Sequence, residues 1–181
     1  VIGYITAFSI LMFPLASTGF SWVLSTTYFT ISEEERKELI FNLFVAGLIL
    51  RAFWMIVFGV AGALVLPRVM HGYQPAYLGY YWCFLLGEWF NYGWEMTAYL
   101  IMLQKKAKVH AALDLVKFAA RVGVLLICLI CFKFKAVSLA LAYLATGISG
   151  FLFSAAYLRQ HMRGPLSKRW LIEIVRLGAP T

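Results

Sequence analysis

The sequence is poor in charged residues. Only 13% of its 181 residues are charged, whereas 62% are apolar. Ordinary soluble domains carry about 25% charged and about 45–50% apolar residues, and a soluble domain of this length cannot hide so much apolar surface. We therefore expect lipid to be the solvent around most of the chain.

Several kinds of chemistry lack the residues they need. Asp114 is the only aspartate, which removes the paired-aspartate magnesium sites of membrane prenyl and phosphatidyl transferases. Three cysteines do not make a disulfide framework, and Cys128 and Cys131 lie inside an apolar run, where a redox motif is not expected. The three histidines fall in different predicted loops, and no glycine-rich phosphate loop or nucleophile elbow is present. We expect no enzyme, no cofactor and no metal site.

Long apolar runs, separated by short polar breaks, occupy most of the chain. A helix rises about 1.5 Å per residue and the hydrocarbon core is about 30 Å thick, so about 20 residues suffice to cross it. The runs lack the alternation of a barrel wall. We expect an all-α, multi-pass helical bundle, a single transmembrane domain over residues 1–181 with five full spans and the start of a sixth. The approximate spans are residues 1–30, 40–66, 76–103, 112–132, 136–158 and 170–181.

Basic residues gather in alternate loops, which predicts the orientation. The first, third and fifth loops hold nine lysines and arginines, and the second and fourth hold three, so the positive-inside rule places the odd loops in the cytoplasm. The net charge of +8 then reflects topology rather than binding to nucleic acid. Val1 falls on the outer side, so we expect one more span upstream. The nine are Arg36, Lys37, Lys105, Lys106, Lys108, Arg159, Arg163, Lys168 and Arg169, and the three are Arg68, Lys133 and Lys135.

Charged residues also occur inside the predicted spans. The stretch GEWFNYGWEMTAYL, residues 87–100, carries two glutamates seven residues apart, which places them on nearly one helix face. A central unpaired charge costs roughly 2.5–3.5 kcal/mol on translocon scales. Two interpretations stay open: structural ion pairs that hold the bundle together, or a hydrated cavity lined by these groups. The residues concerned are Arg51, Glu88, Glu95, Asp114, Lys117 and Arg121.

Both ends of the chain carry a family resemblance. Residues 1–40 resemble the second span and first cytoplasmic loop of bacterial oligosaccharide-repeat flippases. These form the polysaccharide transporter family of the multidrug/oligosaccharidyl-lipid/polysaccharide exporter superfamily. The final RLGAPT resembles the entry to the span that opens the second half of the family's fold. The residues that carry the resemblance are Gly3, Tyr4, Gly19, Glu33 to Glu38, Gly178 and Pro180.

The resemblance implies a two-lobe, MATE-like fold of two six-helix lobes around a central cavity. This chain would be the N-terminal lobe without its first helix, incomplete at both ends. It implies a place in the bacterial inner membrane. The implied function is to flip undecaprenyl-diphosphate-linked oligosaccharide to the outer leaflet by alternating access, for O-antigen, capsule or exopolysaccharide export. The expected partners are this lipid-linked oligosaccharide, membrane lipids and polysaccharide polymerase or assembly proteins.

Roles for the charged residues follow from that cargo. Arginine binds phosphate oxygens in a bidentate fashion, so basic side chains are the candidates for contact with the diphosphate headgroup, and acidic ones for binding a coupling proton or cation. The headgroup candidates are Arg51, Lys117 and Arg121, and the ion-coupling candidates are Glu88, Glu95 and Asp114.

Two other functions compete with flipping. A multidrug or cation antiporter of the same superfamily would need a mainly acidic cavity, whereas the charges here are mixed. A non-transporting membrane subunit of a polysaccharide assembly complex would be favoured if every charge inside the spans were paired without a water-filled path.

Overall fold

The computed structural model describes residues 20–131, 133 and 136–178, with the side chains of 136, 175, 177 and 178 left out. Most of the predicted first span lies outside this part, as do Gly3, Tyr4, Gly19 and Pro180 of the resemblance. The described residues form six helices and no strand, which confirms the all-α fold for that part of the chain. The helices are α3 Phe20–Thr27, α4 Glu33–Val69, α5 Ala76–Leu103, α6 Ala107–Ile130, α7 Ala136–Leu158 and α8 Lys168–Gly178.

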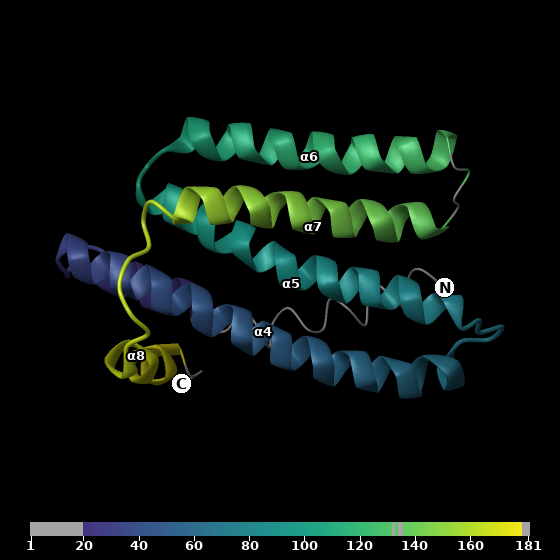
Figure 1. Cartoon of the computed structure of the whole chain (residues 1–181), viewed down its shortest axis with the longest axis horizontal. Coiled ribbons are helices and arrows are strands. Elements are labelled where there is room, and N and C mark those ends of the chain that lie inside the picture. The colour runs from purple at the N-terminus through teal and green to yellow at the C-terminus, as the bar shows by residue number, and fades with distance from the viewer. Residues whose placement is uncertain (1–19, 132, 134–135, 179–181) are drawn as a thin grey trace.

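Four long helices lie in layers along the long axis of the molecule (Figure 1). The central helix α5 packs against α4 on one side and α7 on the other, and α6 covers the outer face of α7. The connections 104–106 and 159–167 lie at the same end as the start of α4, and the connection 70–75 lies at the opposite end, where α6 ends and α7 begins. The first, third and fifth loops, which were expected on one side of the membrane, therefore lie at one end of the bundle. This basic end holds their nine lysines and arginines. Which side of a membrane this end faces stays a prediction.

Two of the described helices are long and apolar enough to cross a membrane, judged by length and composition. They are Glu33–Val69 and Val137–Leu158. The first contains the predicted span 40–66, and the second nearly coincides with the predicted span 136–158. α5 and α6 have the length but not the apolar composition, because α5 is rich in tyrosine, tryptophan and glutamate and α6 carries four charged residues inside its run. The chain thus has two candidate membrane spans in its described part.

The helix α4 starts at a complete capping box. The Oγ of Ser32 accepts a hydrogen bond from the Glu35 backbone N–H at 3.3 Å, and the Glu35 carboxylate accepts one from the Ser32 backbone N–H at 3.2 Å. These bonds satisfy amide groups that have no partner within the helix. The Ser32 hydroxyl also donates to the Glu35 carboxylate at 3.0 Å, and this bond, together with that of the Ser32 backbone N–H, lowers the pKa of the Glu35 carboxyl below its usual value. This cap fixes the start of α4, and the two basic residues Arg36 and Lys37 follow directly after Glu35.

Replacing Ser32 by alanine should lower the free energy of unfolding by about 1 kcal/mol, because the cap loses its acceptor. Thermal unfolding of the purified protein, followed by circular dichroism, measures the loss. The deficit should shrink as the pH falls through the lowered pKa of Glu35, because the stabilisation that this carboxylate provides above the ordinary carboxyl pKa is lost there. Ser25→Ala is the control, since that hydroxyl binds only the exposed Trp22 carbonyl. Equal losses in both variants would contradict the capping role.

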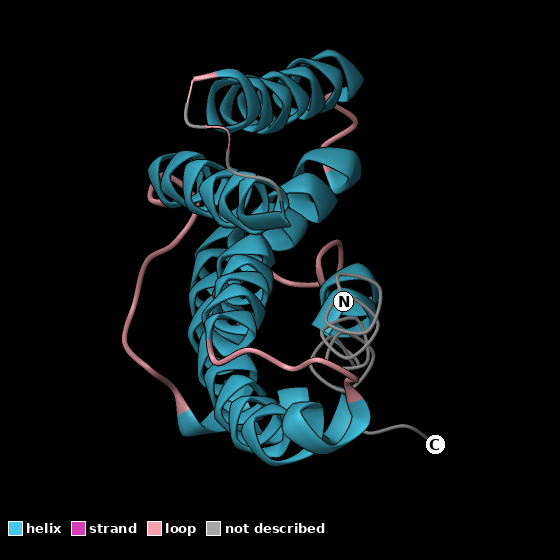
Figure 2. Cartoon of the chain, turned by 90° about the vertical axis from the view of Figure 1, so that its right-hand side faces the viewer, coloured by secondary structure: helices cyan, strands magenta, loops and turns pink. Residues whose placement is uncertain are grey.

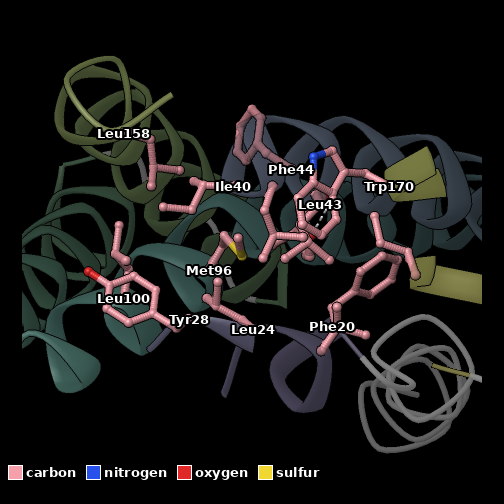
Figure 3. Packing of buried hydrophobic residues seen from close by; sticks show 14 residues of the cluster. Phe20, Leu24, Tyr28, Ile40, Leu43, Phe44, Met96, Leu100, Leu158 and Trp170 are labelled. Atoms are coloured by element: carbon pink, nitrogen blue, oxygen red, sulfur yellow. Dashed lines mark hydrogen bonds between the residues drawn. The ribbon is translucent and has the colours of Figure 1, made fainter. Parts of the chain in front are cut away.

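The main hydrophobic cluster lies near the basic end, where five helices meet. Figure 3 shows its side chains converging from α3, α4, α5, α7 and α8. A second cluster joins α4, α5 and α7 nearer the other end. Outside these clusters, α4 presents a continuous apolar stripe outward at spacings of three and four residues. The stripe consists of the exposed side chains of Ile49, Phe53, Ile56, Val60 and Leu64.

Glycines let aromatic rings of α5 lie directly on the backbone of α4. A Cβ on Gly47 would meet the Tyr92 ring at 2.1 Å, and one on Gly62 would meet the Tyr81 ring at 2.2 Å. Tyr92 also donates a hydrogen bond from its hydroxyl to the Leu43 carbonyl at 2.8 Å. The rings of Tyr92 and Tyr81 therefore occupy the space that a side chain at Gly47 or Gly62 would need, which allows α4 and α5 to pack closely.

The last described helix, α8, covers most of the segment 170–181, whose role as the start of a sixth span stays a prediction. It begins at Lys168, is 11 residues long, and does not share the direction of α4 to α7 (Figures 1 and 2). Trp170 and Ile174 enter the main cluster, one helical turn apart, while Ile172 and Arg176 are exposed. The described part of α8 is thus an amphipathic helix that packs on α3 and α4.

Candidate functional site

The site is built on the polar face of α5. Glu88, Asn91 and Glu95 follow one another at intervals of three and four residues, so they share one side of the helix. Because α5 lies between α4 and α7, with α6 beyond, this face is reached by polar side chains of all three neighbours. The sequence therefore places carboxylates and an amide at the centre of the layers.

Arg51 joins α4 to this face. Its side chain is fully buried, with 0% of the residue exposed. One guanidinium nitrogen donates to the Glu88 backbone carbonyl at 3.1 Å, and another binds the Glu95 carboxylate at 2.5 Å. The guanidinium carbon also lies 4.9 Å from the centroid of the Tyr92 ring, within the range of a cation–π contact. Arg51 is thus held by α5 through a charge, a carbonyl and a ring.

The network continues from Glu95 toward α6. The second carboxylate oxygen of Glu95 accepts a hydrogen bond from the Asn91 amide at 3.0 Å. The Asn91 carbonyl oxygen in turn accepts one from the Lys117 ammonium at 2.5 Å. Lys117 also lies 5.0 Å from the Trp94 ring centroid. A chain of polar contacts therefore runs from α4 through α5 to α6.

Glu88 is held from a third direction. The Tyr143 hydroxyl, on α7, donates a hydrogen bond to the Glu88 carboxylate, and Glu88 is buried. The Arg121 guanidinium lies 5.6 Å from the centroid of the Tyr143 ring. The two carboxylates of α5 thus have different partners: a guanidinium for Glu95 and a phenol for Glu88.

Two hollows lie beside α5. The first, of about 270 Å³, lies between α3, α4 and α5 and is lined by Arg51 and Glu95 together with apolar and aromatic residues. The second, of about 180 Å³, lies between α5, α6 and α7 and contains no carboxylate in its lining. It presents two cations and an amide, which suits an anion. The hydroxyl hydrogens of Tyr143 and Thr146 are already donated to Glu88 and to the Ala142 carbonyl. Its lining is Gly87, Asn91, Lys117, Arg121, Tyr143, Thr146 and Gly147.

The structure brings most of the predicted site residues together. Arg51, Glu88, Glu95 and Lys117 belong to one hydrogen-bonded network, and Arg121 joins them through the second hollow. Their roles in binding a headgroup or a coupling ion stay predictions.

Asp114 does not join them. Its carboxylate pairs with the His110 imidazole at 3.0 Å on the exposed side of α6, although it precedes Lys117 by only three residues.

Sequence reasoning missed Asn91 and Tyr143. Asn91 could have been found, because it lies three residues after Glu88 and four before Glu95 on the same helix face. Tyr143 gives a weaker signal, because it lies in a charge-free apolar run and only Thr146, three residues later, marks the same face as polar. Among the described residues, no group of three or more histidine, cysteine, aspartate or glutamate side chains could hold a metal ion.

Comparison with known proteins adds no relative to this picture. No family model matches the chain, and neither a curated protein nor a solved structure matches it. The function is therefore inferred from the fold and from the network around α5.

Proposed function

We propose that the chain is part of a multi-pass membrane transporter that flips a lipid-linked oligosaccharide, in which an undecaprenyl diphosphate carries the sugar. The observation that carries the proposal is the hollow between α5, α6 and α7. It presents two cationic side chains, Lys117 and Arg121, beside the Asn91 amide and has no carboxylate in its lining. Charge-assisted hydrogen bonds from such cations can replace the water around the oxygen atoms of a diphosphate.

The placement in the membrane is part of this proposal. The two candidate spans, α4 and α7, flank α5, so a membrane that they cross also contains α5. The polar face of α5 is then shielded by its neighbours, while the apolar stripe of α4 meets lipid. The basic end faces the cytoplasm of a bacterium, in agreement with the positive-inside rule. The diphosphate enters the hollow while the prenyl chain stays in lipid.

Headgroup binding competes with contacts inside the protein. Lys117 would exchange the Asn91 carbonyl oxygen for phosphate oxygens, and Arg121 would leave the Tyr143 ring. Because Asn91 also binds Glu95, the loss of Lys117 from the network changes the surroundings of that carboxylate. Glu95 and Glu88 are thus placed to take up or release a proton or cation when the cargo leaves. Arg51 lies at the first hollow and holds α4 to α5.

Changing both Lys117 and Arg121 to glutamine should reduce flipping at least tenfold, because the hollow loses both of its charges. The assay uses proteoliposomes with a fluorescent undecaprenyl-diphosphate-linked sugar and a membrane-impermeant quencher that reports the outer leaflet. Arg68→Gln with Lys133→Gln is the matched control, since both side chains are exposed at the other end of the bundle. Flipping at the wild-type rate in the Lys117/Arg121 variant would refute the proposed role of the hollow.

A second candidate function is that of a non-transporting subunit of a polysaccharide assembly complex. The observation that favours it is that Arg51, Glu88, Glu95 and Lys117 all have protein partners. The same proteoliposomes distinguish the two candidates. Flipping by the wild-type protein supports the transporter. A wild-type protein that does not flip the lipid but copurifies with a polysaccharide polymerase supports the subunit.

A further inference from the structure

A separate hollow opens at the basic end of the bundle, away from the network around α5. Its volume is about 390 Å³, and it lies where the start of α4, the α5–α6 connection and the α7–α8 connection meet. Residues far apart in the sequence are therefore brought to one place. Its lining is Tyr28, Phe29, Glu33, Arg36, Lys37, Ile40, Leu103, Gln104, Lys106 and His161.

The polar side of this basal hollow is cationic. Arg36 and Lys37 come from α4, Lys106 from the α5–α6 connection and His161 from the α7–α8 connection. Glu33 is the only acid in the lining, and it already pairs with Lys37 at 2.7 Å. The charges of two further basic side chains, Arg36 and Lys106, are thus left over for a ligand.

Arg36 makes few contacts with the rest of the described chain. Its guanidinium lies 4.3 Å from the Tyr28 ring centroid, and one terminal nitrogen donates to the Ile31 carbonyl at 3.4 Å. Its Nε is buried and has no hydrogen-bond partner among the described residues. Because that atom is out of reach of solvent, a ligand in the hollow would meet the terminal nitrogens of the guanidinium instead.

The other side of the basal hollow is apolar. Phe29, Ile40 and Leu103 line it, and Phe29 is 66% exposed. An exposed aromatic ring beside a cluster of bases is the arrangement found where a helix leaves the membrane. A soluble phosphate would use only the cationic side, whereas a phospholipid would use both.

We propose that the basal hollow binds the phosphate of an anionic phospholipid, with the upper acyl chains against the apolar side. Arg36 and Lys106 contact the phosphate, and Phe29 contacts the glycerol and first methylenes. Bases at the cytoplasmic end of spans are suited to such headgroups. The inference rests on the membrane orientation given under the proposed function, but not on flipping.

His161 makes the binding depend on pH. Partial burial and the positive charges of Lys106 and Lys37 lower the pKa of its imidazole, and Arg36 and Glu33 are the other charged groups in the lining. A bound phosphate favours the imidazolium, so protonation and lipid binding assist each other. Affinity for the anionic lipid should rise as the pH falls through the pKa of His161.

The test is a titration of the purified protein in detergent with phosphatidylglycerol, phosphatidylcholine or inorganic phosphate, followed by native mass spectrometry. We expect preferential retention of phosphatidylglycerol. Arg36→Gln with Lys106→Gln should weaken it about 30-fold, since each surface base contributes about 1 kcal/mol. Lys106→Gln alone is the second variant, because that side chain is exposed and its loss does not threaten folding. Arg68→Gln with Lys133→Gln is the control of equal charge.

Three outcomes would overturn the proposal. Equal retention of phosphatidylcholine would show that charge does not matter, and binding of inorganic phosphate as tight as that of the lipid would remove the lipid as the ligand. An equal loss in the control variant would assign the effect to general charge attraction. Failure of the flippase proposal is recognised separately, because a protein that retains phosphatidylglycerol selectively but moves no oligosaccharide fails only the flipping assay.

Discussion

Replacing Glu95 by leucine should destabilise the protein by about 3–5 kcal/mol, because the change removes the carboxylate bound by a fully buried guanidinium. Arg51 would keep its bond to the Glu88 carbonyl, but its charge would lose the 2.5 Å contact that compensates for burial. The measurement is the midpoint of thermal unfolding in detergent, compared with the wild-type protein. A loss below about 1 kcal/mol would show that Arg51 does not depend on this pair.

A second variant separates the charge from the packing. Arg51→Met combined with Glu95→Leu removes both charges and keeps most of the volume, and such replacements of buried pairs are often neutral or stabilising. We therefore expect the double variant to recover most of the stability lost in Glu95→Leu. Asp114→Leu is the surface control, since its pair with His110 is half exposed and should contribute no more than about 1 kcal/mol. A double variant as unstable as the single one would contradict the pairing argument.

Replacing Gly147 by alanine should destabilise the α5–α7 contact by about 3 kcal/mol, at the upper end of what overpacking usually costs. A Cβ at this position would lie 2.5 Å from the Gly87 carbonyl oxygen, and that atom belongs to a helix backbone that cannot move alone. The two helices would separate, and Tyr143, one turn earlier on α7, would be drawn away from Glu88. Thermal unfolding measures the loss.

The matched control uses the same substitution on another helix. Gly123→Ala on α6 meets nothing within 4 Å, so it should be neutral or stabilise the protein by up to about 1 kcal/mol through helix propensity. The two alanine substitutions are thus expected to act with opposite signs. A stabilising Gly147→Ala would show that α5 and α7 are not in close contact there.

The apolar runs of the sequence predicted where the long helices lie, because about 20 residues without a polar break favour one continuous helix. Whether α5 and α6 cross a membrane stays a prediction. The range 40–66 lies inside α4, and 136–158 coincides with α7. The seven-residue spacing also placed Glu88 and Glu95 correctly on one face of α5. These features depend only on local periodicity, and that information is fully present in the sequence.

The pairing of those residues could not be predicted. Arg51 binds the carboxylate of Glu95 but only the carbonyl of Glu88, and the Glu88 carboxylate binds Tyr143. That choice depends on how each helix is rotated about its axis, which its neighbours determine. The pair of Asp114 with His110 is different, because the two residues lie four apart on α6 and this spacing could have predicted their contact.

The sixth span, predicted for residues 170–181, stays a prediction, because the described part of α8 ends at Gly178. Its amphipathic pattern could have been read from the sequence, since Trp170 and Ile174 recur with helical periodicity among charged residues.

The ring-and-glycine fit between α4 and α5 restricts how the protein can move. Sliding α4 along α5 by one helical turn, about 5.4 Å, would bring side chains with a Cβ against Tyr81 and Tyr92, which now rest on Gly62 and Gly47. These contacts therefore oppose sliding of α4 along α5. By contrast, α6 packs mainly on α7, and it carries both cations of the second hollow.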